Sequence, residues 1–266
     1  DNLSRTYGLA PNGVIAIGTN GGVIAATRYT TLTVSQPIAL GTNELSIGSN
    51  EKVDWVSEPK LGTVTLSASI GANTGEQGSR ITVLPGAELR NGANALPDLA
   101  DVVVAGAFYA SADTIGSLSG TGLVTVSASN LTVGRNDADS VFAGVLAGGN
   151  YGFYKTGAGR LDLTGDKNTF TGTFRVNGGE LALSGNGKLL NTGNTAFTLV
   201  EDGVLHLDNS ETNLTDRLTG AAPGVTFNGG TLRFTGKDGE ASSETLGIPN
   251  FGLNASTIEV INGSGA

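Results

Sequence analysis

Residues 159–165 read Gly-Arg-Leu-Asp-Leu-Thr-Gly, and residues 179–185 repeat the pattern as Gly-Glu-Leu-Ala-Leu-Ser-Gly. The pattern returns twice more, as Gly-Val-Leu-His-Leu-Asp at 203–208 and as Gly-Thr-Leu-Arg-Phe-Thr-Gly at 230–236. Successive copies start 20, 24 and 27 residues apart. Repetition at a period of about 20–50 residues is typical of solenoids. The variable period indicates one constant strand joined by loops of changing length.

The hydrophobic residues of each copy are two positions apart, so they share one face of a strand. We expect these side chains to point into one shared interior: Leu161, Leu163, Leu181, Leu183, Leu205, Leu207, Leu232 and Phe234. The residues between them are expected to face outward: Asp162, Ala182, His206 and Arg233. A slip of one residue would bury charged side chains without partners. If successive copies stack, Arg160 and Glu180 should lie about 4.8 Å apart and form an exposed ion pair contributing at most about 1 kcal/mol.

Short alternating segments occur throughout the chain, and apolar residues do not recur at helical spacing over any useful window. Turn-forming pairs rich in Gly, Asn and Asp separate these segments. The sequence therefore predicts an all-β solenoid of roughly 11 turns. A β-sandwich is the alternative fold, but it gives no reason for one pattern to return at each turn. The aromatic content of 6% is also low for a sandwich core.

The composition of the 266 residues excludes several classes of protein. Charged residues make up only 15% and hydrophobic residues 38%, which is not the balance of a disordered chain. The 42 glycines lack the strict three-residue period of collagen. The absence of cysteine excludes disulfides and thiolate metal sites. No run of 18 apolar residues occurs, so no transmembrane helix is expected.

The formal net charge is −9, and the 15 Lys and Arg residues are scattered singly. Binding to nucleic acid requires the opposite sign of charge, so no nucleic acid partner is expected. The glycine-rich stretches are not followed by Lys-Ser/Thr and a helix, so they are interpreted as turns rather than phosphate loops. No cofactor is expected.

The stretch from Asp113 to Gly185 resembles a known family. Residues 155–165 follow its pattern K-T-G-x-G-x-L-x-L-T-G, and residues 168–172 follow N-x-[YF]-x-G. A valine-led strand ending in G-x-L completes the match at residues 176–181. This segment resembles the passenger-associated, or autotransporter-associated, β-strand repeat. The resemblance is close over about 70 residues, looser toward the C-terminus, and a matter of texture only in residues 1–110.

The resemblance implies a right-handed parallel β-helix in an extracellular or bacterial cell-surface protein. It divides the chain into weakly matching solenoid turns at 1–110 and a repeat-bearing solenoid at 111–266. Arg160 and Asp162 stand where the family more often has threonine, and Phe174 with Arg175 replaces a small or polar pair. These departures are expected at outward or loop positions.

Catalysis by paired carboxylates requires two such groups about 5–9.5 Å apart, on adjacent or next-adjacent turns. One outward column reads Asp162, Ala182, His206, Arg233, and the other reads Arg160, Glu180, Val204, Thr231. Neither contains a pair of carboxylates. His206 is the only histidine, and its flanking leucines predict a lone surface position. We expect no catalytic residues.

Asn136, Asp137, Asp139 and Ser140 cluster oxygen ligands that could hold Ca²⁺. The cluster occurs once and lacks the nine-residue frame of calcium-binding β-rolls, so a solvated turn is favoured and no metal site is assigned. Trp55 could be a carbohydrate platform, although a packing role at a strand end is favoured. N-glycosylation sequons occur at Asn2, Asn130, Asn213, Asn254 and Asn262.

The sequence therefore predicts a non-enzymatic structural β-solenoid, a stalk or fibre-forming segment of a large surface or secreted protein. An adhesin that binds a host surface or polysaccharide through its loops is the alternative, and a carbohydrate-active β-helix enzyme is the second alternative. Neither terminus shows a polar cap or an amphipathic helix. Open solenoid ends require cover, so we expect further repeats of a longer chain, or homotypic end-to-end or lateral association.

Overall fold

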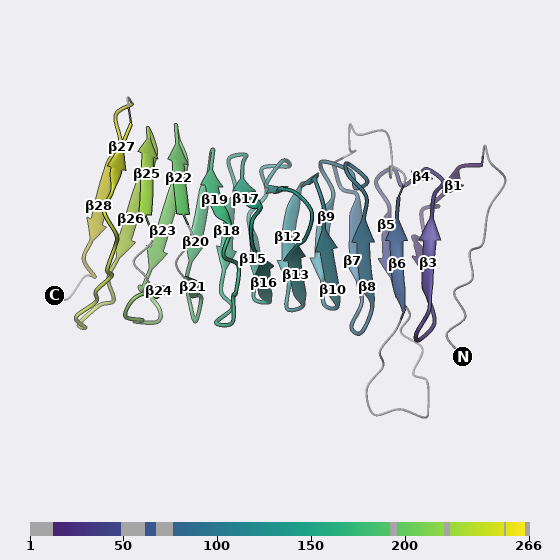
Figure 1. Ribbon diagram of the computed structural model, residues 1–266, viewed down its shortest axis with the longest axis horizontal. Helices are drawn as coiled ribbons and strands as arrows, with labels where there is room; N and C mark the ends of the chain where they lie inside the picture. Colours follow the sequence, from purple (N-terminus) through teal and green to yellow (C-terminus); the bar gives the residue numbers. More distant parts are fainter. Residues whose placement is uncertain are drawn as a thin grey trace.

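The computed structural model describes residues 13–48, 62–67, 77–191, 196–220, 224–252 and 254–263. These residues form strands and turns without any helix. Within them, no helix is long and apolar enough to cross a membrane. Most strands belong to three parallel sheets whose strands follow one another along the long axis of an elongated molecule (Figure 1).

The longest sheet, called the long sheet below, contains eleven strands in the order of the chain. Its neighbouring strands pair in parallel. The strands are β2 (Gly22–Ile24), β5 (Glu44–Ile47), β7 (Arg80–Val83), β9 (Asp101–Val104), β12 (Ser117–Gly120), β15 (Ser140–Phe142), β18 (Arg160–Leu163), β20 (Glu180–Leu183), β23 (Val204–Asp208), β26 (Thr231–Thr235) and β28 (Thr257–Ile261).

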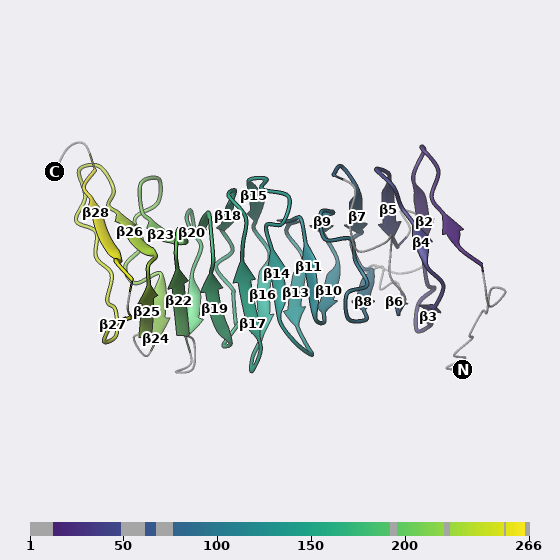
Figure 2. The same ribbon diagram turned by 90° about the horizontal axis from the view of Figure 1, so that it is seen from above.

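Two further parallel sheets complete the coil, and Figure 2 shows them from above. The six-stranded sheet contains β3 (Thr31–Val34), β6 (Thr63–Leu66), β8 (Glu88–Asn91), β10 (Ala107–Ala110), β13 (Leu123–Val126) and β16 (Val145–Gly148). The seven-stranded sheet contains β11 (Asp113–Ile115), β14 (Leu131–Val133), β17 (Gly152–Lys155), β19 (Thr173–Val176), β22 (Ala196–Val200), β25 (Gly224–Asn228) and β27 (Asn250–Phe251). Two short parallel pairs are β1 (Ile15–Ala16) with β4 (Ile38–Ala39), and β21 (Leu189–Asn191) with β24 (Leu218–Gly220).

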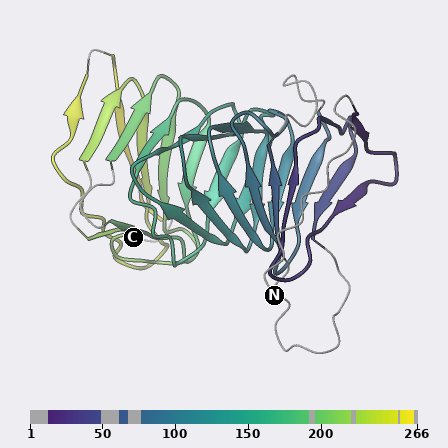
Figure 3. The same cartoon turned by 45° about the vertical axis from the view of Figure 1, so that its right-hand side comes forward.

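Between β9 and β17 the chain visits the three sheets in turn. From β12 it passes through β13 of the six-stranded sheet and β14 of the seven-stranded sheet, and then returns to the long sheet at β15. The oblique view in Figure 3 shows these strands wrapped around a common interior. The molecule is thus an all-β parallel β-helix, as the sequence predicts. The handedness, the number of complete turns and the division at residue 110 stay predictions.

The interior contains the hydrophobic residues that alternation assigns to it. Leu161 pairs with Leu181, Leu181 with Leu205, and Leu205 with Leu232, so each contributes to one inward column. Seven of the eight residues predicted to face inward are buried, and Phe234 packs against the same cluster. The predicted register of the repeated pattern is confirmed.

The seven-stranded sheet adds a column of phenylalanines to this interior. Phe174 stacks on Phe197 of the next turn with ring centroids 5.0 Å apart, and Phe170 packs edge-on to Phe174 at 4.9 Å. The expectation that Phe174 occupies an outward or loop position was wrong, since its side chain is fully buried. Arg175, the next residue, faces outward as alternation requires.

Glycine allows the backbones of successive turns to approach closely. A Cβ atom on Gly165 would collide with the carbonyl oxygen of Gly144 in the preceding turn, and one on Gly157 would collide with that of Gly134. Gly157 also has a φ of +69°, a conformation that favours glycine. Stacking therefore requires glycine at both positions, and at Gly157 the turn geometry requires it as well.

Candidate functional site on the outer face of the long sheet

The outward side chains divide the long sheet into two halves. From β2 to β15, here the smooth half, the central outward column holds small or aliphatic residues: Val23, Ser46, Thr82, Val103, Ser119 and Val141. From β18 to β28, here the charged half, the same column continues with Asp162, Ala182, His206, Arg233 and Glu259. The inward columns of both halves are aliphatic or aromatic almost throughout.

A network of ion pairs, called the charged ladder, covers the charged half. Its members are Arg160, Asp162, Glu180, His206, Asp208, Arg233 and Glu259. Arg160 Nη2 donates to Asp162 Oδ2 at 2.9 Å and to Asp208 Oδ2 at 3.2 Å, while Arg160 Nη1 donates to Glu180. The predicted pairing of Arg160 with Glu180 across adjacent strands is present. The expectation that this pair is exposed was wrong, because the two side chains are only 32% and 18% exposed.

Glu180 is the centre of the ladder. Besides Arg160, its carboxylate accepts a hydrogen bond from Arg233 Nη1 at 3.1 Å, and His206 Nδ1 lies 2.8 Å from its Oε1 atom. Arg233 Nε also donates to Glu259 Oε2 at 2.7 Å, which carries the ladder to β28. Contacts of Glu180 thus connect β18, β20, β23 and β26.

His206 lies on the outward side of β23, but it is not the lone surface histidine that its flanking leucines suggest. Only 10% of its side chain is exposed. Its Nε2 atom lies 2.9 Å from Thr235 Oγ1, and Arg160 Nη1 lies 3.2 Å from its Nδ1 atom. Alternation predicts the side of a strand on which a residue lies, whereas long side chains from neighbouring turns decide whether it is covered.

Electrostatics stabilise the charged forms in this network. Burial disfavours the charge on Glu180, but the contacts with His206, Arg160 and Arg233 hold its pKa below the usual value. Asp208 shows the same balance, because hydrogen bonds from Ser210 and the nearby cations outweigh burial and lower its pKa. Burial would lower the pKa of Arg160, but the hydrogen bond and charge of Asp162 and the charge of Glu180 raise it.

The structure brings together two carboxylates that the outward columns separate. Asp162 on β18 and Asp208 on β23 both contact Arg160 Nη2. They were missed as a pair because Asp208 lies one outward position beyond His206, outside both columns. Asp162 Oδ2 also accepts from Ser184, and Asp208 Oδ1 accepts from Ser210. These carboxylates are engaged as acceptors within the ladder.

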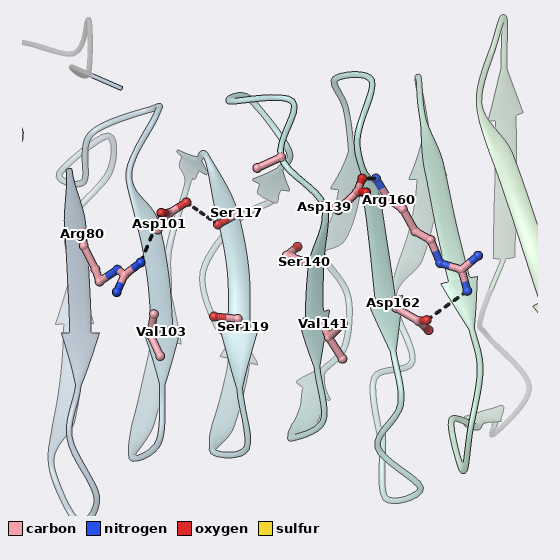
Figure 4. Close-up of a pocket in the computed structure, with 11 residues that line it drawn as sticks. Arg80, Asp101, Val103, Ser117, Ser119, Asp139, Ser140, Val141, Arg160 and Asp162 are labelled. Carbon is pink, nitrogen blue, oxygen red and sulfur yellow. Dashed lines mark hydrogen bonds and ion pairs between the residues drawn. The ribbon is translucent and has the colours of Figure 1, made fainter. Parts of the chain in front are cut away.

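A groove with a volume of about 490 Å³ extends over the end of the smooth half and reaches the first strand of the charged half, β18. Figure 4 shows its lining across five neighbouring strands, from Arg80 on β7 to Arg160 and Asp162 on β18. The central lining consists of short side chains: Val103, Ser117, Ser119, Ala138, Ser140 and Val141. The groove exists because these residues are short, while an arginine stands at each end.

The matched repeat pattern places a buried lysine in the seven-stranded sheet. Lys155 is 1% exposed and lies in the inward column between Val133 and Val176. Its Nζ atom donates to the carbonyl oxygen of Thr156 at 2.6 Å and to that of Gly157 at 3.1 Å. Burial lowers its pKa to about 8, although Asp137, Asp139 and Glu180 favour the charged form. The lysine therefore holds a turn together from within.

Asn168 has a similar role at the next corner. It is fully buried, its Oδ1 accepts from Leu146 N at 2.8 Å, and its Nδ2 donates to Gly165 O at 2.7 Å and Lys188 O at 2.9 Å. It thus contacts the turns before and after its own. Both Lys155 and Asn168 stand at fixed positions of the quoted family pattern, which is the signal that could have identified them.

Two other buried polar residues had no such signal. Asp113 Oδ2 accepts from Asn91 Nδ2 at 2.6 Å and from Leu96 N at 3.0 Å, and burial raises its pKa to about 6. Arg217 is fully buried and donates to Asn209 Oδ1 at 2.6 Å and Gly187 O at 2.8 Å. Burial lowers its pKa. Both residues stabilise loops between strands.

The oxygen-rich turn that could hold calcium bonds to the backbone of the next turn. Asp137 Oδ1 accepts from Ala158 N and Asp139 Oδ1 accepts from Arg160 N, each at 2.7 Å. Asn136 Nδ2 donates to Asp101 Oδ1 at 2.9 Å. No group of three or more His, Cys, Asp or Glu side chains suited to a metal ion occurs in the part of the chain that the structure describes.

The remaining candidates are spread over the molecule. Trp55 and Asn2 lie outside the described residues. Three of the sequon asparagines make hydrogen bonds: Asn130 accepts from Gly152 N, Asn213 donates to Ala241 O, and Asn254 donates to Asn228 O. The fifth, Asn262, is exposed.

Comparison with known families matches residues 153–183 to the passenger-associated-transport-repeat. No curated protein and no solved structure matches the chain. The matched segment begins at Phe153 in the phenylalanine column, includes Lys155 and Asn168, and ends at Leu183 in the long sheet. The predicted resemblance is confirmed: within its parallel β-helix, this chain carries a passenger-associated-transport-repeat, a repeat of the passenger domains of autotransporter-type proteins.

Proposed function

We propose that this chain is a non-enzymatic structural segment, a rigid stalk of a secreted or cell-surface protein. The observation that carries the proposal is the long sheet, whose eleven strands follow the order of the chain without interruption. Each turn of such a coil contacts only its neighbours, so stiffness comes from stacking. The passenger-type repeat supports an extracellular or bacterial cell-surface location.

The use of polar groups supports a structural role over a catalytic one. The carboxylates of the charged ladder are paired with arginines, His206 or hydroxyl groups. Lys155 and Asn168 bond to the backbone of adjoining turns. Chemistry that requires a free acid and a free base has no such pair in the ladder. The carbohydrate-active enzyme is accordingly the least favoured alternative.

Association through the last strands is part of the proposal. Ile258 and Val260 continue the inward columns of Leu232 and Phe234, yet they are 52% and 65% exposed. Phe251 stacks on Phe227 at 4.9 Å and is 56% exposed. A further turn of β-helix, from the same chain or from another copy, would cover these side chains and extend the sheets. No feature of the described loops favours adhesion through loops over this role.

Electron microscopy of the purified chain, combined with a screen for polysaccharide cleavage, tests the proposal. The expected particle is a rod about 50 Å long, from eleven strands about 4.8 Å apart, or a filament of such rods. Treatment with a chelator should leave the rod unchanged. A globular particle, or turnover of a polysaccharide that is lost in Asp162→Asn, would overturn it.

A further inference from the structure

The groove spans five neighbouring strands of the long sheet and has an arginine at each end. Arg80 and Arg160 are separated by four strand intervals of the long sheet, so their backbones lie about 19 Å apart along the axis. Val103, Ser119 and Val141 form the central outward column between them. All five strands from β7 to β18 thus contribute side chains to a strip that runs along the rod (Figure 4).

Some polar groups of the lining are bonded to each other, whereas others have no protein partner. Asp101 Oδ1 accepts from Ser117 Oγ at 2.6 Å, and Arg160 Nη2 donates to Asp162 Oδ2 at 2.9 Å. In the described part of the chain, the hydroxyl groups of Ser119 and Ser140 have no protein partner. Polar groups left unbonded over adjacent strands are available to a ligand.

Three more polar groups along the strip are available to contact a ligand. Asp139 uses one carboxylate oxygen to accept from Arg160 N, which leaves its Oδ2 atom without a protein partner among the described residues. Arg80 is 51% exposed, and its one ion pair, with Asp101, is long at 3.8 Å. Asp162 Oδ1 is buried at the far end without a hydrogen-bond partner.

The chemistry of the lining selects among classes of ligand. Two arginines and three aspartates line the groove, so its formal charge is −1, on a chain whose net charge is −9. This balance disfavours an anionic ligand. The free groups include both donors and acceptors, and hydroxyl groups match such a mixture because each donates and accepts. Val103 and Val141 offer methyl groups to the apolar face of a ring.

We propose that this groove binds a neutral, extended oligosaccharide that lies along the axis of the rod. The free polar groups come from strands spaced about 4.8 Å apart, so a ligand with hydroxyl groups repeated along its length can contact several strands. Binding at a sheet face, rather than through loops, is an activity beyond the structural role and does not depend on it. A site of about 490 Å³ is within the usual range for ligand pockets.

The test titrates the isotope-labelled chain with neutral cello-, chito- and malto-oligosaccharides and follows backbone amide resonances. We expect shifts at the groove strands β9, β12, β15 and β18, with affinity rising from disaccharide to hexasaccharide for at least one series. Ser119→Phe fills the centre of the groove from an outward position and should weaken binding about tenfold or more. Ser46→Phe, the same change in the same column outside the groove, should leave binding unchanged.

Asp139→Asn is the second variant. It keeps the oxygen that caps Arg160 N but replaces the free oxygen with an amide, so the fold is retained while one acceptor is lost. It should weaken binding of the same oligosaccharide. The proposal is overturned if none of the three neutral series shifts the groove resonances, if Ser119→Phe binds as tightly as the parent chain, or if oligolysine occupies the groove in preference to the neutral sugars.

Discussion

The smooth half and the charged half of the long sheet share one interior but present different outer faces. Leu45 on β5 and Leu181 on β20 are both fully buried in the same inward column. Outside, Ser119 has no protein partner among the described residues, whereas Glu180 contacts Arg160, His206 and Arg233. The inward positions maintain the coil, so the outward positions are free to form a groove in one half and an ion-pair network in the other.

This difference indicates where stability and binding reside. In the charged half, outward side chains connect neighbouring turns and add to the stacking energy. In the smooth half, outward side chains such as Ser117 and Asp101 also bond across turns. Val103, Ser119 and Val141 have no such bonds among the described residues, which leaves the outer surface around them open to a ligand. A pair of matched substitutions, one in each half, therefore tests each part of the comparison.

The largest effect is expected in the interior, and it should be equal in the two halves. Leu45→Ala and Leu181→Ala each remove a fully buried side chain, which costs about 2–5 kcal/mol of unfolding free energy. Urea unfolding followed by far-UV circular dichroism measures both. Val141→Ala, at an outward side chain that is 53% exposed, is the control and should change stability by less than about 0.5 kcal/mol. A large loss in one half only would contradict a shared interior.

The second largest loss of unfolding free energy is expected for the buried side-chain amide of Asn168. Asn168→Ala leaves Leu146 N and the carbonyls of Gly165 and Lys188 without their partner, at a cost of about 1–3 kcal/mol. The same urea experiment measures it, with the exposed Asn186→Ala as control. If the two variants unfold alike, Asn168 does not hold adjoining turns together.

Lys155 predicts a dependence on alkaline pH. Its pKa is about 8 in the folded chain and 10.5 in the unfolded one, so the unfolded state binds more protons between these values. Stability should therefore rise with pH over this window, by about 1–3 kcal/mol relative to Lys155→Met, which has no such group. Parallel pH titrations of unfolding compare the two chains. A constant difference from pH 8 to 10.5 would show that the ammonium group is not buried.

The ladder should contribute a smaller amount, confined to the charged half. Glu180→Gln removes the charge that Arg160, His206 and Arg233 share, and should cost about 1–2 kcal/mol at neutral pH. The surface variant Glu211→Gln should be neutral. High salt should reduce the difference between Glu180→Gln and the parent chain.

Acid provides a second readout for the same variant. The pKa of Glu180 is lowered in the folded chain, so its contribution is present above the unfolded pKa of 4.5 and is lost as the pH falls through the folded value. The parent chain and Glu180→Gln should converge in stability below that range. If they stay equally far apart in acid, the charge of Glu180 is not what stabilises the ladder.

The sequence predicted the coil because its inward pattern is strict and repeated. Leu161, Leu181, Leu205 and Leu232 occur at positions that only a stacked register explains. For the outer face, the sequence predicted which residues point outward, but not which of them are exposed. The exposure of His206 depends on Arg160 and Glu180, which reach it from other turns, and alternation along one strand does not encode how long side chains lie.

Buried polar residues limited the prediction further. Lys155 and Asp113 occupy inward positions, which a hydrophobic pattern assigns to apolar side chains. Their burial is stabilised by backbone atoms of other turns, for example Gly178 O for Lys155 and Leu96 N for Asp113. Such partners come together only when the loop paths are known, so the sequence could not assign them.

The most direct test of the account measures distances along the outer face between two spin labels. The chain has no cysteine, so each label can be attached to one of two introduced cysteines. Val23, Val141 and Glu259 lie in one outward column and are separated by five strand intervals each. Val23 and Val141 are exposed, and Glu259 is half-buried. The account predicts about 24 Å for Val23 to Val141, about 24 Å for Val141 to Glu259, and about 48 Å for Val23 to Glu259. Distances that do not add in this way, as in a folded-back sandwich, would contradict a single continuous coil.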